Sequence, residues 1–119
     1  RSYFARNGFR VSGEGIKIGV LSNSYNTQTG AEIDIINGDL PGPGNIDENY
    51  TPVDVIKDCP AGIGQHTDEG RAMLQIVHDI APKAELAFRT GTISSSDFAL
   101  GIKELANAGC DIIVDDIFS

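Results

Sequence analysis

The sequence is poor in cysteine, tryptophan and basic residues. It has two cysteines, no tryptophan, and nine lysines and arginines against 17 acidic residues in 119. Two cysteines are too few for a disulfide scaffold. The formal net charge of −8 and the scattered basic residues argue against binding to a nucleic-acid backbone, which needs clustered cations. No apolar run approaches the roughly 18 residues of a membrane span, so we expect neither a nucleic-acid nor a membrane partner.

The hydrophobic content and the length fit one folded domain. Hydrophobic residues make up 40% of the chain, which is too many for a disordered protein. We expect residues 1–119 to form a single domain. The chain begins with Arg1 rather than Met, so we expect it to be a processed or excised piece of a longer protein.

Four short apolar segments have the length and composition of buried strands. Each is bounded by polar residues or glycine, and they cover residues 16–21, 53–57, 84–88 and 111–114. Residues 38–52 are rich in glycine, proline, asparagine and aspartate, which is typical of a loop. That loop offers oxygen ligands between Asp39 and Glu48, but their spacing matches no EF-hand, and we expect no metal site.

Helical spacing predicts the segments between these strands. A short helix is expected over 31–37, with Ile33 and Ile36 on one face. A longer helix is capped by Thr67 or Asp68 and ends at Pro82. Its apolar face is predicted from residues at the helical period, Ala72, Met73, Ile76, Val77 and Ile80.

The last predicted helix begins at Ser94 and ends at Gly109. Ser94 and Asp97 have the spacing of a capping box, with aspartate in place of glutamate. The residues predicted for its buried face are Phe98, Ile102, Leu105 and Ala106.

Strands that alternate with helices predict an α/β fold, a doubly wound (Rossmann-like) parallel sheet of about four strands joined by right-handed crossovers. The strand over 111–114 would leave an apolar edge uncovered, so we expect a partial sheet that can self-associate through this edge. A complete small flavodoxin-like domain is the alternative.

Polar groups follow each predicted strand, and the carboxyl ends of parallel strands are where ligands bind in such sheets. These groups are residues 22–24, Asp58 with Cys59, Arg89 with Thr90, and Asp115 with Asp116. Asp68 and Glu69 fall in the first turn of the longer helix, where they either stabilise the helix end or take part in chemistry.

Several segments resemble subtilisin-like serine peptidases. Residues 12–24 resemble the Gly-x-Gly turn and apolar strand that lead into that family's catalytic aspartate. Residues 69–73 are similar to the segment that carries its catalytic histidine at the head of a helix. Further likenesses follow in the same order, at residues 81–86, 101–102 and 111–113.

The resemblance implies the N-terminal half of a peptidase domain, which in the longer protein hydrolyses peptide bonds. It also implies an exported protein, periplasmic or extracellular. Asn23 stands where the family has its aspartate, and Glu69 where it has its histidine. The positions of the substrate-lining strand are Asp115, Asp116, Ile117 and Phe118.

These departures imply a weakened or lost catalytic triad. The family's nucleophilic serine lies in a later Gly-Thr-Ser segment, beyond Ser119, so we expect no hydrolysis by this chain alone. Sedolisins, relatives of this fold, use a glutamate base supported by an aspartate one turn along the helix, where this chain has Met73. The Asn23 amide is expected to donate a hydrogen bond to Glu69. The expected partner is a polypeptide substrate or a partner domain, with no cofactor.

Two other functions remain open. One is a non-catalytic relative that uses its cleft to bind peptides or partner domains. The other is a receiver-type signalling domain, because Asp115 and Asp116 are similar to the acidic pair of receivers, although that pair follows the first strand there.

The histidines and cysteines are given structural roles. His66 is expected in a solvated loop. His78 is expected in the last turn of the longer helix, where it can bond the final carbonyls and complement the dipole. The resemblance to a subtilisin-like sheet implies that Cys59 and Cys110 lie at opposite ends of non-adjacent strands, too far apart to bridge, so we expect two free thiols, with Cys110 buried.

Overall fold

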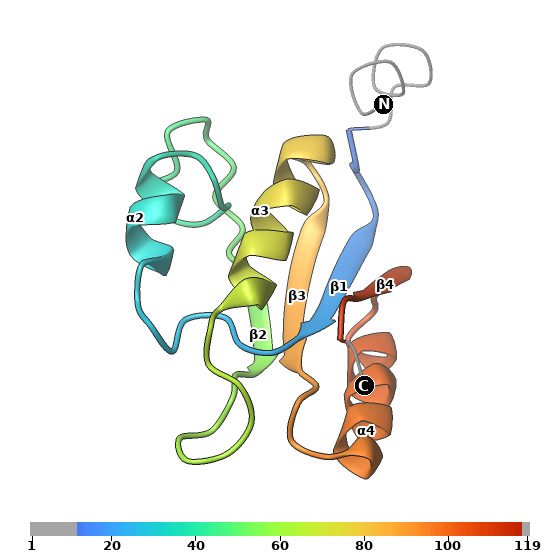
Figure 1. Cartoon of the computed structure of the whole chain (residues 1–119). Helices are drawn as coiled ribbons and strands as arrows, with labels where there is room; N and C mark the ends of the chain where they lie inside the picture. Colours follow the sequence, from blue (N-terminus) through green and yellow to red (C-terminus); the bar gives the residue numbers. More distant parts are fainter. Residues whose placement is uncertain (1–11, 118–119) are drawn as a thin grey trace.

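The structure is a computed structural model that describes residues 12–117, and it is an α/β fold with one parallel sheet (Figure 1). The four strands lie in the order β2-β3-β1-β4. No helix in the described part of the chain is both long and apolar enough to cross a membrane. The elements are β1 (Lys17–Ser22), α2 (Ala31–Ile36), β2 (Asp54–Lys57), α3 (Glu69–Ile80), β3 (Glu85–Thr90), α4 (Ser95–Asn107) and β4 (Ile112–Asp115).

Helices cover both faces of the sheet, which confirms the doubly wound arrangement. On one face, Leu74 and Val77 of α3 pack with Val20 of β1 and Phe88 of β3, together with Ala31 of α2. The other face is covered by α4, whose Leu105 packs against the small cluster around Leu21 and Ala87. The central strands β1 and β3 are therefore the most deeply buried, and the edge strands β2 and β4 are partly exposed.

One crossover has the hand opposite to the other two. The connections β1–α2–β2 and β2–α3–β3 lie on the same face of the sheet but run in opposite directions along it, so they have opposite hands. In Figure 1 the strands run downward and α3 lies in front of them, which makes β2–α3–β3 left-handed. Such connections are right-handed in about 98% of cases. The prediction of right-handed crossovers is therefore wrong for this unit.

The buried face of α3 is rotated relative to the sequence prediction. Leu74, Val77, His78 and Gly70 are buried. Ile76 is 57% exposed and Ile80 is 44% exposed. Two of the buried positions on this face are occupied by Gly70 and His78. Because neither is a large apolar residue, the spacing of apolar residues alone does not predict this face.

The other two helices differ from the prediction in the same way. In α2, Ile33 and Ile36 are exposed, and Ala31 and Ile35 pack on the core. In α4, Leu105 and Gly101 are buried. Two residues predicted to be buried there, Ile102 and Ala106, are exposed.

The caps of α4 largely follow the sequence. The Ser94 hydroxyl accepts a hydrogen bond from the Asp97 amide at 3.1 Å, as predicted. Gly109 ends the helix with φ of 96°, a conformation that glycine adopts without strain.

The thiols of Cys59 and Cys110 are free, as predicted. Cys59, however, is the buried one, and Cys110 is half-buried.

Candidate functional site

Two carboxylates from distant loops hold the segment that follows β1. Asp58, after β2, accepts the backbone N–H groups of Tyr25 at 2.8 Å and Asn26 at 2.9 Å. Asp68, before α3, accepts those of Thr27 at 2.9 Å and Gln28 at 2.7 Å. The loop from Ser22 to Gln28 is therefore fixed by contacts far apart in sequence.

Asp68 is a buried charge with many partners. Its carboxylate also accepts the Ser24 hydroxyl at 2.7 Å and lies 3.3 Å from Nη1 of Arg71. Burial alone would raise the pKa of Asp68, but the hydrogen bonds from Ser24, Gln28 and Thr27 bring it below its ordinary value of 3.8. Asp68 is thus ionised and structural.

Asn23 and Glu69 lie next to each other, as predicted from two separate strand-to-helix junctions. Nδ2 of Asn23 lies 3.4 Å from Oε1 of Glu69 and donates a shorter bond, 2.6 Å, to Oγ1 of Thr67. Asn23 is buried, and Glu69 is exposed. The predicted contact of amide with carboxylate is present, but it is long.

Asn23 also caps α3 from outside the helix. Its Oδ1 accepts the Glu69 N–H at 2.9 Å, and the carbonyl of Ser24 accepts the Gly70 N–H at 3.0 Å. Asp68 occupies the N-cap position, but its side chain makes no capping bond. The prediction of a cap from Thr67 or Asp68 is therefore wrong, because the Asp68 carboxylate is turned toward the loop after β1.

A cavity of about 250 Å³ opens beside Asn23 at the carboxyl edge of the sheet; we call it the Asn23 cavity. Within the described residues, two buried polar atoms at this cavity have no hydrogen-bond partner, Oγ of Ser22 and Oδ1 of Asp116. The residues that line it are Ser22, Asn23, Gln65, Glu69, Thr92, Asp116 and Ile117.

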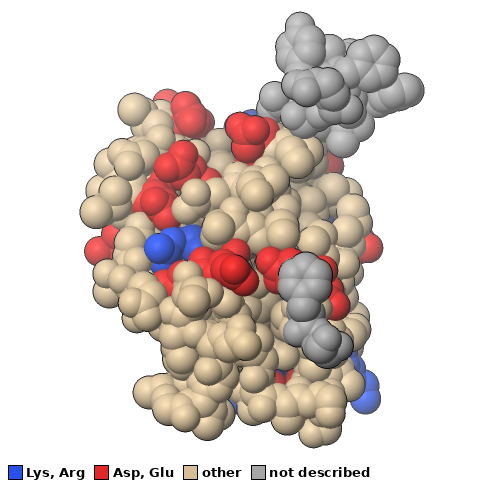
Figure 2. Space-filling view, viewed as in Figure 1, with Lys and Arg blue, Asp and Glu red and all other residues tan. Residues whose placement is uncertain are grey.

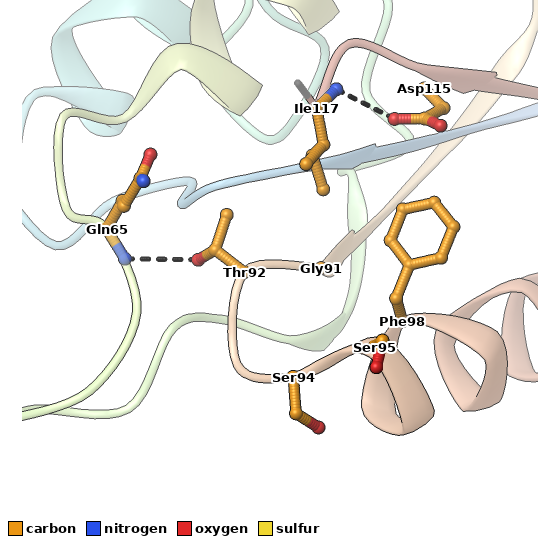
Figure 3. Close-up of a pocket in the computed structure, with 8 residues that line it drawn as sticks. All are labelled: Gln65, Gly91, Thr92, Ser94, Ser95, Phe98, Asp115 and Ile117. Atoms are coloured by element: carbon orange, nitrogen blue, oxygen red, sulfur yellow. Dashed lines mark hydrogen bonds between the residues drawn. The ribbon is translucent and has the colours of Figure 1, made fainter. Parts of the chain in front are cut away.

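A second cavity, of about 480 Å³, adjoins it and is called the Phe98 cavity. Gln65, Thr92 and Ile117 line both, so the two form one cleft. Figure 3 shows the Phe98 ring and the Ile117 side chain at this cavity, and the Thr92 hydroxyl accepting a hydrogen bond from the backbone N–H of Gln65. The remaining lining residues are Gly91, Ser94, Ser95 and Asp115.

The predicted substrate-lining residues divide between the two cavities. Asp116 and Ile117 line the Asn23 cavity, and Asp115 with Ile117 lines the Phe98 cavity. Asp115 is the last residue of β4, so it does not follow the strand as expected, and its carboxylate accepts the Ile117 N–H at 2.7 Å. Phe118 lies outside the described residues.

Acidic side chains gather around this cleft. In Figure 2, acidic groups lie side by side near the start of α3 and beside the grey residues. The carboxylates that line the cleft are those of Glu69, Asp115 and Asp116. Among the described lining residues of both cavities, none is a lysine or arginine. The cleft is therefore negatively charged.

Arg89, predicted near the site, lines neither cavity and faces α4. It is buried against α4, where its guanidinium binds both oxygens of Asp97 at 2.6 and 3.2 Å and Glu104 at 2.8 Å. The bond to Arg89 lowers the pKa of Asp97. The Thr90 hydroxyl donates to the Asn23 carbonyl and supports the loop. Both residues are structural.

Neither histidine lines the Asn23 cavity or the Phe98 cavity. Nε2 of His66 lies 2.8 Å from the Ile63 carbonyl oxygen, and the ring is half-buried. His78 lies in the last turn of α3, as predicted. Its burial lowers its pKa and favours the neutral ring, and in the part of the chain described its Nδ1 has no partner.

Gln65, Thr92 and Phe98 were not expected at the site. Thr92 lies two residues past the end of β3, and that position at the carboxyl edge was the signal that could have found it. Gln65 lies in a long loop, and nothing in the sequence predicts which way that loop folds.

Within residues 12–117, no group of three or more histidine, cysteine, aspartate or glutamate side chains is placed to hold a metal ion. Comparisons with protein-family models, with curated proteins and with solved structures gave no match to this chain.

Proposed function

We propose that this chain is the N-terminal part of a subtilisin-like serine peptidase domain, in an exported protein, and that its cleft binds a polypeptide. The observation that carries the proposal is the meeting of Asn23 and Glu69 in one cavity. Their side chains come from separate strand-to-helix junctions and lie 3.4 Å apart. The sequence resemblance puts the family's aspartate and histidine at these two positions.

The shape of the cleft supports an extended ligand. The Asn23 and Phe98 cavities adjoin, with volumes of about 250 and 480 Å³. Phe98 and Ile117 provide apolar surface for a side chain, and Thr92, Ser94 and Ser95 provide polar groups. A largely apolar hollow with a few polar groups is typical of ligand sites.

We propose binding without hydrolysis by this chain alone. The Ser24 hydroxyl donates a hydrogen bond to Asp68. The side-chain oxygen of Asn23 accepts the N–H groups of Ser24 and Glu69, and its side-chain nitrogen donates to Thr67. Hydrolysis needs an activated nucleophile, and the resemblance puts that serine beyond Ser119.

The strand order argues against the receiver-type alternative. Flavodoxin-like sheets, to which receivers belong, have the order 2-1-3-4-5. Here β3 lies between β2 and β1. The acidic residues Asp115 and Asp116 are also at the edge strand β4.

A titration of the isotopically labelled chain with casein-derived peptides tests the proposal. We expect chemical-shift changes at the amides of Asn23, Glu69 and Thr92, and no cleavage of the peptides. Changes confined to residues outside the cleft, or no changes at all, would overturn peptide binding at this site.

The non-catalytic relative is the second candidate, because Asn23 is fully used in structural bonds and Glu69 is exposed. Peptide hydrolysis by the longer protein distinguishes the peptidase from the non-catalytic relative. If its gene encodes a Gly-Thr-Ser segment before a helix, and Asn23→Asp raises its hydrolysis of a fluorogenic peptide, the peptidase is supported. Equal inertness of both folded forms favours the binding module.

A further inference from the structure

We propose that the Asn23 cavity binds a cationic side chain, a lysine ammonium or an arginine guanidinium, of a polypeptide in the cleft. The inference rests on the proposed function. It extends that function by naming the type of polypeptide side chain that the Asn23 cavity selects.

The charge of the cleft is the first observation. Glu69 and Asp116 line the Asn23 cavity, and Asp115 lines the Phe98 cavity beside it. No lysine or arginine is present among the lining residues that the structure describes. Coulomb attraction is stronger where the surroundings are partly desolvated, so an incoming cation is favoured and an anion is repelled.

The unpartnered polar atoms are the second observation, and the Ser22 hydroxyl among them is independent of the charge. Ser22 is only 1% exposed, and its hydroxyl has no partner among residues 12–117. Oδ1 of Asp116 is also buried and, among the same residues, unpartnered. A buried acceptor without a donor is costly, and an ammonium or guanidinium brings several N–H donors and no acceptor. Such a group supplies the kind of donor that both oxygen atoms lack.

The alternatives leave one of these observations unexplained. A metal ion needs several ligands, and the described residues hold no group of three suitable side chains. An apolar side chain would leave Ser22 and Asp116 without donors. A volume of about 250 Å³ suits a single side chain, and Ile117 lines both cavities, so the methylene stem of a lysine can lie along it.

The experiment measures binding of two blocked pentapeptides to the labelled 119-residue chain, Ala-Ala-Lys-Ala-Ala and the same peptide with Nε-acetyl-lysine. We expect the lysine peptide to bind about tenfold more tightly, because acetylation removes the charge. The preference should weaken at high ionic strength. Shifts should centre on Ser22, Asn23 and Asp116.

Three variants test the residues. Asp116→Asn and Glu69→Gln should each weaken binding of the lysine peptide about fivefold to tenfold and leave the acetylated peptide unchanged. Glu14→Gln, an exposed glutamate that lines neither cavity, removes the same charge and should change nothing. Where a variant does not fold, the salt dependence of the wild-type preference decides.

Butylammonium, the side-chain amine without a peptide, separates the two proposals. Equal affinity for both peptides overturns cation selection and leaves polypeptide binding standing. Binding of butylammonium that depends on Asp116, with no peptide bound, overturns the polypeptide and leaves the cation site. No shift with any probe overturns both.

Discussion

The side chain of Asp68 stabilises the loop after β1 and makes no capping hydrogen bond to α3, although Asp68 occupies the N-cap position of that helix. Its carboxylate accepts bonds from Ser24, Thr27 and Gln28, and it pairs with Arg71. The backbone of Asp68 has a positive φ of 57°, which is uncommon for a residue other than glycine. The many bonds to its carboxylate offset the burial of the charge and the cost of this conformation.

We expect Asp68→Asn to lower the free energy of unfolding by about 3 kcal/mol, because an amide group would face backbone N–H donors and Arg71 would lose its charge partner. The pKa of Asp68 is lower in the folded state than its ordinary 3.8. The wild type therefore has this stability above pH 3.8 and loses it as the pH falls through the folded pKa.

Urea unfolding followed by circular dichroism at pH 7 and at decreasing pH checks this prediction. Glu32→Gln, at an exposed residue of α2, is the control. The prediction fails if Asp68→Asn is as stable as the control, or if its stability still has the full acid dependence of the wild type.

Asn23 is the second residue whose loss should be large. Asn23→Ala removes the acceptor for the N–H groups of Ser24 and Glu69, and we expect a loss of about 2–3 kcal/mol. Asn23→Asp keeps that acceptor but places a carboxylate beside Glu69, so its loss should be smaller than that of Asn23→Ala at high ionic strength, where salt screens the repulsion. Thermal unfolding of the two variants tests this, and equal losses would show that Asn23 does not cap α3.

Tyr25 gives a prediction at alkaline pH. Its ring packs on Phe88, with the ring centroids 5.8 Å apart, and burial raises its pKa from 10.0 to about 12. The unfolded chain loses this proton first, so stability should fall as the pH rises from 10 toward 12. Denaturant unfolding of Tyr25→Phe should show a weaker fall; an identical fall in both proteins would contradict this assignment.

At the scale of elements, α3 decides the topology. Its first turn is bound to the loop after β1 through Asn23, Ser24 and Gly70. These contacts hold α3 on the face that α2 also occupies, so the chain must return to β3 by a left-handed crossover. Tertiary contacts at the start of the helix therefore override the usual hand of the connection.

Gly70 allows this close approach. A Cβ at this position would lie 2.2 Å from Cε1 of Phe88 and 2.6 Å from the Ser24 carbonyl oxygen. Alanine normally stabilises a helix relative to glycine by about 1 kcal/mol. We expect Gly70→Ala instead to destabilise the protein by about 2–3 kcal/mol, because the Ser24 carbonyl belongs to the backbone and cannot move away from the added methyl group without shifting the loop.

Chemical denaturation of Gly70→Ala measures this effect, with Ala72→Ser, at an exposed position of the same helix, as the control. An unchanged or raised midpoint for Gly70→Ala would show that α3 is free to move away from the loop.

For the whole molecule, the exposed edge of β4 and the net charge act in opposite directions. β4 pairs with β1 on one side, and the described residues place no strand on its other side. Ile112 in this edge is 48% exposed. The formal net charge of −8 repels a second copy, and salt screens this repulsion.

We therefore expect self-association through the segment predicted as 111–114, stronger at high ionic strength. Light scattering should give a mass that rises with concentration for the wild type. Ile112→Lys places a charge on the edge and should keep the chain monomeric. A wild-type monomer at every concentration and salt level would rule this out.

The sequence alone predicted the elements because their signals are local. The apolar runs 16–21 and 84–88 fall within a residue or two of β1 and β3, and Ser94 caps α4 as expected. The pairing of Asn23 with Glu69 was also predictable, since parallel strands bring their carboxyl ends to one edge.

Tertiary structure alone decided the buried face of α3, its external cap and the hand of the β2–α3–β3 crossover. The reason is that these features depend on contacts between segments more than 40 residues apart, such as Asn23 with Glu69 and Ser24 with Asp68. It also decided that Ser22 and Asp116 line one cavity without partners among the described residues, because no local pattern records which acceptors a fold leaves unpaired.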